Sequence, residues 1–271
     1  MKKRRGIPCL LVAALLLFAA CVRNGEAETE AHLGDFTSPE VKAVAFSVYE
    51  GGVCEIEIRT EESDAGDWDY HEIAFPEESD LSAIEKMTAL EEAVLFFAPA
   101  DLGRDGESLR KITERFLSLS SVRILMIEYA PFDLGRLEIP LPEETHLVKC
   151  GLQSTVDLTD VRKLYLTDTA WGKDSFRGTE KVSFLSLDQR SVPESLSALS
   201  AFPGITRLML PAGEDGYAGE WPAELTAEHP EIPAGILLPF SEEELRAFLE
   251  ANPDLTVVLR RSDGLPASDR P

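Results

Sequence analysis

The feature that most constrains the fold of this chain is a repeated change in the spacing of its apolar residues. In the stretch LSALSAFPGITRLML, apolar residues first recur every three positions, from Leu196 to Ile205, and then after two, from Leu208 to Leu210. Steps of three suit a helix or a helical turn, and steps of two suit a strand. A unit of helix, turn and strand cannot bury its own apolar edge, so it must stack on a similar unit.

The same change of spacing recurs along the chain. It is present in residues 80–97, 108–127, 158–166 and 179–187, and in a weaker form in 145–150. The predicted inward anchors of the successive strands are Leu95, Ile127, Cys150, Leu166, Leu187 and Leu210. Their separations are 32, 23, 16, 21 and 23 residues. We therefore expect neighbouring, parallel strands that share one continuous apolar seam.

Over roughly Leu81 to Leu259 this pattern resembles leucine-rich repeats, whose period is about 20 to 29 residues. The resemblance implies an α/β fold, a leucine-rich-repeat-like solenoid of parallel strands and short helices. The spacing is irregular, and other residues stand where the family has an inward asparagine: Ala98, Ala130, Thr169, Arg190 and Gly213. The alternative is an α/β domain of parallel strands and short helices without repeats.

Both ends of the predicted domain carry recognisable signals. Residues 41–60 alternate around Gly51 and Gly52, which favours a β-hairpin that caps the stack. The acidic residues 61–72 that follow predict a solvated loop. Near the other end, residues 241–259 begin with a capping-box spacing and predict a helix followed by a strand.

The amino terminus predicts export. Residues 1–21, MKKRRGIPCLLVAALLLFAAC, join a basic start to an apolar run that is too short to span a bilayer, as in a signal peptide. The end of this run, LFAAC, resembles the lipobox of bacterial lipoproteins, although Phe18 stands where that family usually has leucine. The resemblance implies that Cys21 receives a diacylglycerol thioether and becomes the first mature residue. An ordinary signal peptide cut near the same place is the alternative.

The chain is therefore divided into a lipoprotein signal peptide (1–20), a flexible tether (21–40), the leucine-rich-repeat-like domain (41–260) and a disordered tail (261–271). We expect the protein to be lipid-anchored in the bacterial cell envelope, at the outer membrane and facing the periplasm or the surface. With 49 acidic against 26 basic residues and a net charge of −23, it is expected to repel nucleic acid.

No motif predicts chemistry. The sequence has no nucleophile elbow, phosphate loop, HExxH helix or paired-cysteine zinc spacing, so we predict neither an enzyme nor a cofactor or metal. Carboxylates are abundant, and a hydrolase site that assembles only in three dimensions remains an alternative. We predict that Cys54 and Cys150 are buried free thiols, with a disulfide as the alternative.

One surface is predicted to bind a partner. In each strand, the residue between two inward residues points to the opposite face of the sheet. With two flanking residues, these partner-binding candidates are Val94, Met126, Lys149, Tyr165, Phe184, Ser186, Arg207 and Met209. Apolar side chains mixed with charges suggest recognition of a protein or peptide, which requires that Tyr165 and Met126 be exposed. The alternatives are that helices or loops cover this stripe, or that the lipoprotein is purely structural.

Overall fold

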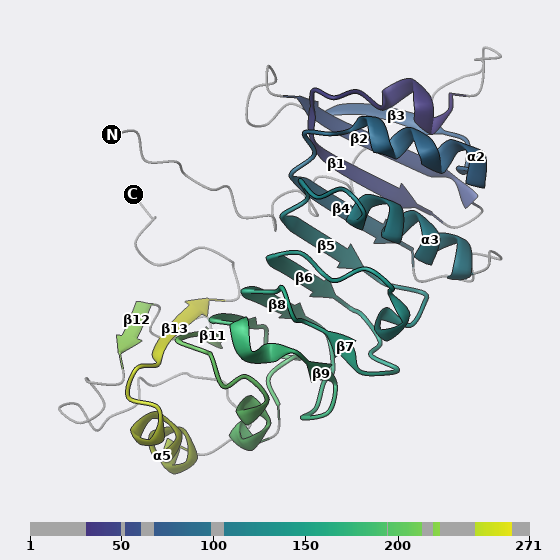
Figure 1. The fold of residues 1–271 in the computed structure, drawn as a ribbon. Helices are drawn as coiled ribbons and strands as arrows, with labels where there is room; N and C mark the ends of the chain where they lie inside the picture. Colours follow the sequence, from purple (N-terminus) through teal and green to yellow (C-terminus); the bar gives the residue numbers. More distant parts are fainter. Residues whose placement is uncertain are drawn as a thin grey trace, which may run out of the picture. The chain divides into compact units, whose positions relative to one another are not determined.

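The structure is a computed structural model of the 271-residue chain. It describes residues 31–49, 52–60, 68–98, 106–193, 195–212, 219–222 and 242–261. Within these residues the fold is α/β, with an 11-stranded, mostly parallel sheet of order β12-β13-β11-β10-β8-β6-β5-β4-β1-β2-β3 (Figure 1). The predicted class, α/β with parallel strands and short helices, is confirmed at this level.

The strands of this sheet are β1 (Val41–Val48), β2 (Cys54–Thr60), β3 (Asp69–Ile73), β4 (Glu92–Phe97), β5 (Ile124–Glu128), β6 (Glu144–Val148), β8 (Lys163–Thr167), β10 (Phe184–Leu187), β11 (Arg207–Ala212), β12 (Gly219–Pro222) and β13 (Thr256–Arg261). The helices are α2 (Glu78–Leu81), α3 (Gly106–Leu117) and α5 (Glu242–Ala251), with 3-10 turns η1 (Leu33–Phe36), η3 (Ser82–Lys86), η4 (Leu134–Arg136), η5 (Thr179–Lys181) and η6 (Leu196–Ala201). A separate pair, β7 (Val156–Asp157) and β9 (Phe176–Arg177), is parallel.

The parallel strands follow one another in chain order. From β4 through β5, β6, β8 and β10 to β11, each strand pairs with the next in the same direction, and β1 and β13 extend this parallel set at its two ends. The predicted hairpin is confirmed, because β1 and β2 pair in antiparallel fashion and β3 adds a third strand. At the other edge β12 pairs with β13 in antiparallel fashion.

One face of the sheet carries the core. Leu164, Leu185 and Leu208 are register partners on β8, β10 and β11, and all three are fully buried. A second row joins Ile127 to Leu147, continues through Leu166 and Leu187, and is also buried. Because strands lie only about 4.8 Å apart, equal registers align these side chains into continuous apolar rows. The shared seam that the spacing predicts is therefore present.

The segments between the strands cover this core face. Figure 1 shows α2 and α3 on one side of the sheet, in front of β1, β4 and β5. In α3, Leu109, Ile112 and Phe116 recur at helical spacing and are buried, and the ring of Phe116 lies 6.4 Å from that of Phe46 on β1. Farther along the chain, Trp171 and Phe176 from the segment between β8 and β10 pack with Phe202 from the segment between β10 and β11, with centroids 5.6 to 5.9 Å apart.

A column of small polar side chains links the turns after β6, β8 and β10. The Thr169 hydroxyl donates to the carbonyl oxygen of Leu147 at 3.1 Å and accepts from the Cys150 amide at 3.2 Å. The Thr169 amide in turn donates to Ser191 Oγ at 3.0 Å. Cys150, Thr169 and Ser191 are at most 3% exposed, so these bonds satisfy backbone groups that lack water.

The predicted register of β6 is wrong. Val148 and Cys150 were the predicted inward residues, but the structure turns Thr145 and Leu147 towards the core. Thr145 is tolerated there because its hydroxyl donates to the carbonyl of Pro142 at 3.0 Å. β6 ends at Val148, and Lys149 follows with a φ of 50° that breaks the strand. Cys150 therefore lies in the turn, although Cys54 and Cys150 are buried thiols that are not joined in a disulfide, as predicted.

Two further boundaries differ from the sequence predictions. The tether prediction is wrong for residues 31–40: Leu33 of η1 is fully buried, and Phe36 stacks on His71 at 4.1 Å. The predicted acidic loop is wrong for Asp69 to Glu72, which belong to β3 because their backbone pairs with β2.

Several sequence predictions lie outside the described residues. They concern the signal peptide, the rest of the tether from Cys21 to Glu30, Gly213, and residues 262–271 of the tail. In the part of the chain that is described, no helix combines the length and apolar character needed to cross a membrane.

Thr169→Val tests the polar column. Valine keeps the shape of threonine but leaves the Cys150 amide without its acceptor, so we expect a loss of about 1 to 3 kcal/mol in the free energy of unfolding, measured by urea denaturation. Thr167→Val, in β8, is the matched control and should change stability little, since valine favours strands. Equal stability of the two variants would contradict this assignment.

Candidate binding surface on the sheet

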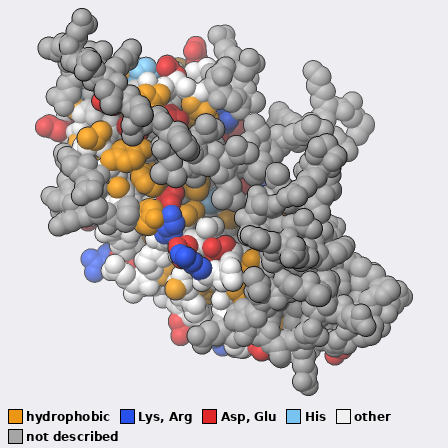
Figure 2. All heavy atoms as spheres, turned by 180° about the vertical axis from the view of Figure 1, so that it is seen from behind, with side chains coloured by type: hydrophobic (Ala, Val, Ile, Leu, Met, Phe, Trp, Pro, Cys, Tyr) orange, Lys and Arg blue, Asp and Glu red, His pale blue; other side chains and the backbone are white. Residues whose placement is uncertain are grey.

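The sheet face opposite the core is the candidate binding surface, and we call it the second face. Its central row of register partners consists of Ala45, Val94, Met126, His146, Tyr165, Ser186, Met209 and Val258. Figure 2, viewed from behind, shows hydrophobic side chains gathered in its upper half, where Figure 1 places β1, β4 and β5, with basic and acidic groups beside them. This mixture is typical of recognition surfaces.

Three aromatic side chains form a stack across β6, β8 and β10. The ring of His146 lies parallel to that of Tyr165, with centroids 3.9 Å apart and planes 5° from parallel. Phe184 meets the other side of Tyr165 at 5.1 Å. The parallel registers of the three strands bring these rings together: His146 is the register partner of Tyr165, whereas Phe184 lies diagonally, two residues before the partner of Tyr165 on β10.

Glu144 holds this stack in place electrostatically. It lies at the start of β6, where one carboxylate oxygen is 3.1 Å from His146 Nε2 and the other accepts from Lys163 Nζ at 2.8 Å. The hydrogen bonds from His146 and then Lys163 lower the pKa of Glu144 to about 2, against the burial that would raise it. The carboxylate therefore fixes the ring of His146 against Tyr165 and stays ionised at neutral pH.

A second aromatic cluster lies nearer β1. Phe96 on β4 contacts Tyr49 at 5.5 Å and Tyr129 at 6.1 Å between ring centroids. Lys149 places its ammonium 4.5 Å from the centre of the Tyr129 ring and 3.0 Å from a carboxylate oxygen of Glu128. Burial, and then a hydrogen bond to Glu55, raise the pKa of Tyr49 to about 12. The cluster thus joins apolar rings to one cation held beside a carboxylate.

Tyr129, Lys149 and Asp168 share an unusual backbone conformation. Each follows the end of a strand, and their φ angles are 57°, 50° and 48°. A residue other than glycine rarely adopts positive φ, because its Cβ then crowds the backbone. Each of these residues thus ends its strand in a turn, at the carboxyl end of β5, β6 or β8.

The predicted binding residues are only partly accessible. Val94 and Met126 are 7% and 6% exposed, so the expected exposure of Met126 is wrong. Ser186 is 9% exposed.

The other predicted residues keep contact with solvent. Tyr165, Phe184 and Met209 are half-buried, and Arg207, the register partner of Phe184, is exposed. Lys149 is accessible, but it lies in the turn after β6 and not in the central row, because the register of β6 differs from the prediction.

Sequence reasoning missed the residues that complete the surface. His146 was not predicted, because the predicted register of β6 placed Lys149 in the position that His146 occupies. Tyr49 and Tyr129 lie just beyond strand ends, where alternation gives no signal. An aromatic residue one position past a predicted strand was the available clue.

The described residues hold no group of three or more histidine, cysteine, aspartate or glutamate side chains placed to bind a metal ion. Comparison with family models, with curated proteins and with solved structures found no match for the chain.

Glu144→Gln tests the electrostatic role of Glu144. Folding lowers the pKa of this carboxyl from 4.5 to about 2, so its contribution is complete above about pH 4.5 and is lost as the pH falls towards 2. We expect the parent protein to lose about 1 kcal/mol more stability than Glu144→Gln between pH 5 and pH 2.5, after allowance for solvent screening.

Urea denaturation at the two pH values measures this difference. Glu180→Gln, at an exposed position of η5, is the control and should follow the parent protein. If Glu144→Gln lost as much stability as the parent on acidification, the carboxylate would not stabilise the fold in this way.

Proposed function

We propose that this protein is a lipid-anchored, non-enzymatic binding protein of the bacterial cell envelope that recognises a protein or peptide through the second face. The observation that carries the proposal is the stack of His146, Tyr165 and Phe184, together with the cluster of Tyr49, Phe96 and Tyr129 on the same side of the sheet. Aromatic rings give large contact areas at a small cost in conformational entropy, and they are enriched in protein interfaces.

The charged groups favour a protein or peptide over nucleic acid. Lys149 and Lys163 alternate with Glu128 and Glu144 around the aromatic clusters, so both signs of charge flank the rings. A chain of net charge −23 repels phosphate backbones but can pair with individual side chains of either sign.

We further propose that the fold is a solenoid related to leucine-rich repeats. Its support is a repeated pattern at the amino ends of the strands, where one carbonyl accepts bonds from the following strand. These bonds are Arg123 and Ile124 to Glu91, Glu144 to Arg123, Arg162 and Lys163 to Glu143, Ser183 and Phe184 to Arg162, and Thr206 and Arg207 to Ser183. The buried Thr169 hydroxyl acts where the family would have asparagine.

Membrane attachment rests on the sequence 17–21, LFAAC, since Cys21 lies outside the described residues. A thioether-linked diacylglycerol would hold the mature chain at a membrane, because each buried CH2 contributes about 0.8 kcal/mol.

Cys21→Ser should move the protein from the membrane fraction to the soluble fraction, since serine cannot form the thioether. Partition between detergent and water phases, followed by immunoblotting, measures this shift. Cys9→Ser, inside the apolar run, is the matched control and should remain with the membranes. Unchanged partition of Cys21→Ser would refute lipid attachment.

Recognition through the second face can be tested by photocrosslinking in intact cells. A photoreactive phenylalanine analogue at Arg207, which is exposed beside Phe184, should give a discrete crosslinked protein. The same analogue at Ser79, an exposed position of α2, should not, because it lies on the helical side. Tyr165→Ala should weaken the crosslink about fivefold or more, the loss typical of an interface hot spot.

Phe36→Ala in η1 is the matched aromatic control, because Phe36 stacks on His71, which faces the core side of the sheet. It should leave the crosslink intact, and melting temperatures should show that both alanine variants fold. Absence of a crosslink from position 207, identical products from positions 207 and 79, or an effect of Phe36→Ala equal to that of Tyr165→Ala would each contradict recognition through this face.

A further inference from the structure

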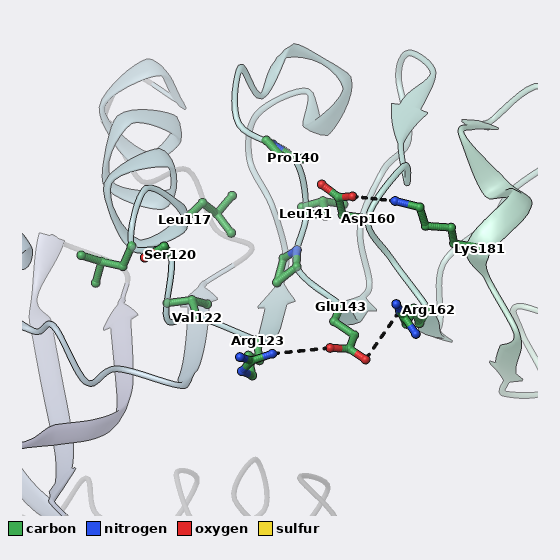
Figure 3. A pocket seen from close by; sticks show the side chains of 12 residues that line it. Leu117, Ser120, Val122, Arg123, Pro140, Leu141, Glu143, Asp160, Arg162 and Lys181 are labelled. Carbon is green, nitrogen blue, oxygen red and sulfur yellow. Dashed lines mark hydrogen bonds and ion pairs between the residues drawn. The ribbon is translucent and has the colours of Figure 1, made fainter.

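A pocket at the amino ends of β5, β6 and β8 lies apart from the second face and has no part in the proposed function. It has a volume of about 380 Å³ and is lined by residues from the end of α3 and from the segments that precede the strands. Figure 3 shows Arg123, Glu143 and Arg162 along the lower part of the pocket, and Asp160 and Lys181 above them beside Leu141.

The backbone pairing at the amino ends of β5, β6 and β8 sets the positions of the charged residues in the pocket. Arg123, Glu143 and Arg162 each precede a strand, and the backbone bonds of Glu144 to Arg123 and of Arg162 to Glu143 hold them one strand spacing apart. The Glu143 carboxylate therefore lies between two guanidinium groups, 3.8 Å from each (Figure 3). That distance is too long for a hydrogen bond, so both guanidinium groups keep donors that Glu143 does not satisfy.

The local charge is opposite to that of the whole chain. Lys181 pairs with Asp160 at 3.0 Å, which neutralises both groups. Arg123 and Arg162 share the single carboxylate of Glu143, so one positive charge remains in the pocket, while acidic residues outnumber basic ones 49 to 26 overall. The pocket thus attracts an anion on a protein that otherwise repels anions.

The wall of the pocket is apolar and rigid. The half-buried Leu119 and the exposed Pro140 present apolar surface beside the charged groups, and Leu117, Val122 and Leu141 are buried behind them. Leu141 is flanked by Pro140 and Pro142, whose rings fix φ and hold this segment in place. A preformed apolar wall costs little ordering on binding, and it suits an apolar side chain that neighbours the anion.

We infer that this pocket binds an acidic residue and an adjacent apolar residue of a partner protein. The partner's carboxylate takes donors from Arg123 and Arg162 in competition with Glu143, and its apolar neighbour packs on Leu119 and Pro140. A protein segment fits better than a free anion, because a small anion would leave the apolar wall and most of the volume unused.

The test uses the full-length chain in detergent and the acetylated, amidated tripeptide Leu-Asp-Leu as probe. NMR should show saturable shifts of the Nε–Hε resonances of Arg123 and Arg162, and the matched peptide Leu-Asn-Leu should bind at least about threefold more weakly. Arg123→Gln with Arg162→Gln should weaken binding of the aspartate peptide by about threefold or more, and added salt should weaken it in the parent protein.

Glu143→Gln tests the inference by a gain of binding, which a loss of fold, as could occur in the double arginine variant, would not produce. It removes the competing carboxylate and should tighten binding of the aspartate peptide about threefold. Arg177→Gln, which alters another exposed arginine paired with Asp157, is the control and should bind like the parent protein. Unchanged or weaker binding by Glu143→Gln, equal binding of the two peptides, or equal shifts with inorganic phosphate would overturn the inference.

Discussion

The structure depends on the alignment of apolar side chains on the core face of the sheet. Leu164, Leu185 and Leu208 can be buried together only if their strands run parallel and in equal register. That register also determines what the second face presents, because alternate residues of the same strands point there. The stack of Tyr165 with its neighbours and the spacing of the charges at the amino ends follow from the same alignment.

The sequence was sufficient where apolar spacing was unambiguous. Leu166, Leu187 and Leu210 each sit in a stretch that changes from helical to strand spacing, and the strands fall where that change predicts them. The α/β class and the N-terminal hairpin could be predicted for the same reason. The order of the strands was also predictable, since consecutive units that share an apolar edge pack side by side.

The sequence was insufficient where a polar residue faces the core or where function depends on turns. Thr145 faces the core because a backbone carbonyl satisfies its hydroxyl, which a search for apolar residues cannot detect. Because of this error in β6, the prediction assigned Lys149 to the place in the binding surface that His146 occupies in the structure. The pair Arg123 and Arg162 was missed because residues just before strands have no periodicity, although a charged residue in that place in successive units was a visible signal.

The most direct test of the account is the register of β6 against β8, measured by nuclear Overhauser effects between side chains. The account predicts contacts from the ring of His146 to that of Tyr165, and from Tyr165 to Phe184. Contacts of Tyr165 with the methylene groups of Lys149, and none with His146, would contradict it, because the apolar rows and the second face would then both be misplaced.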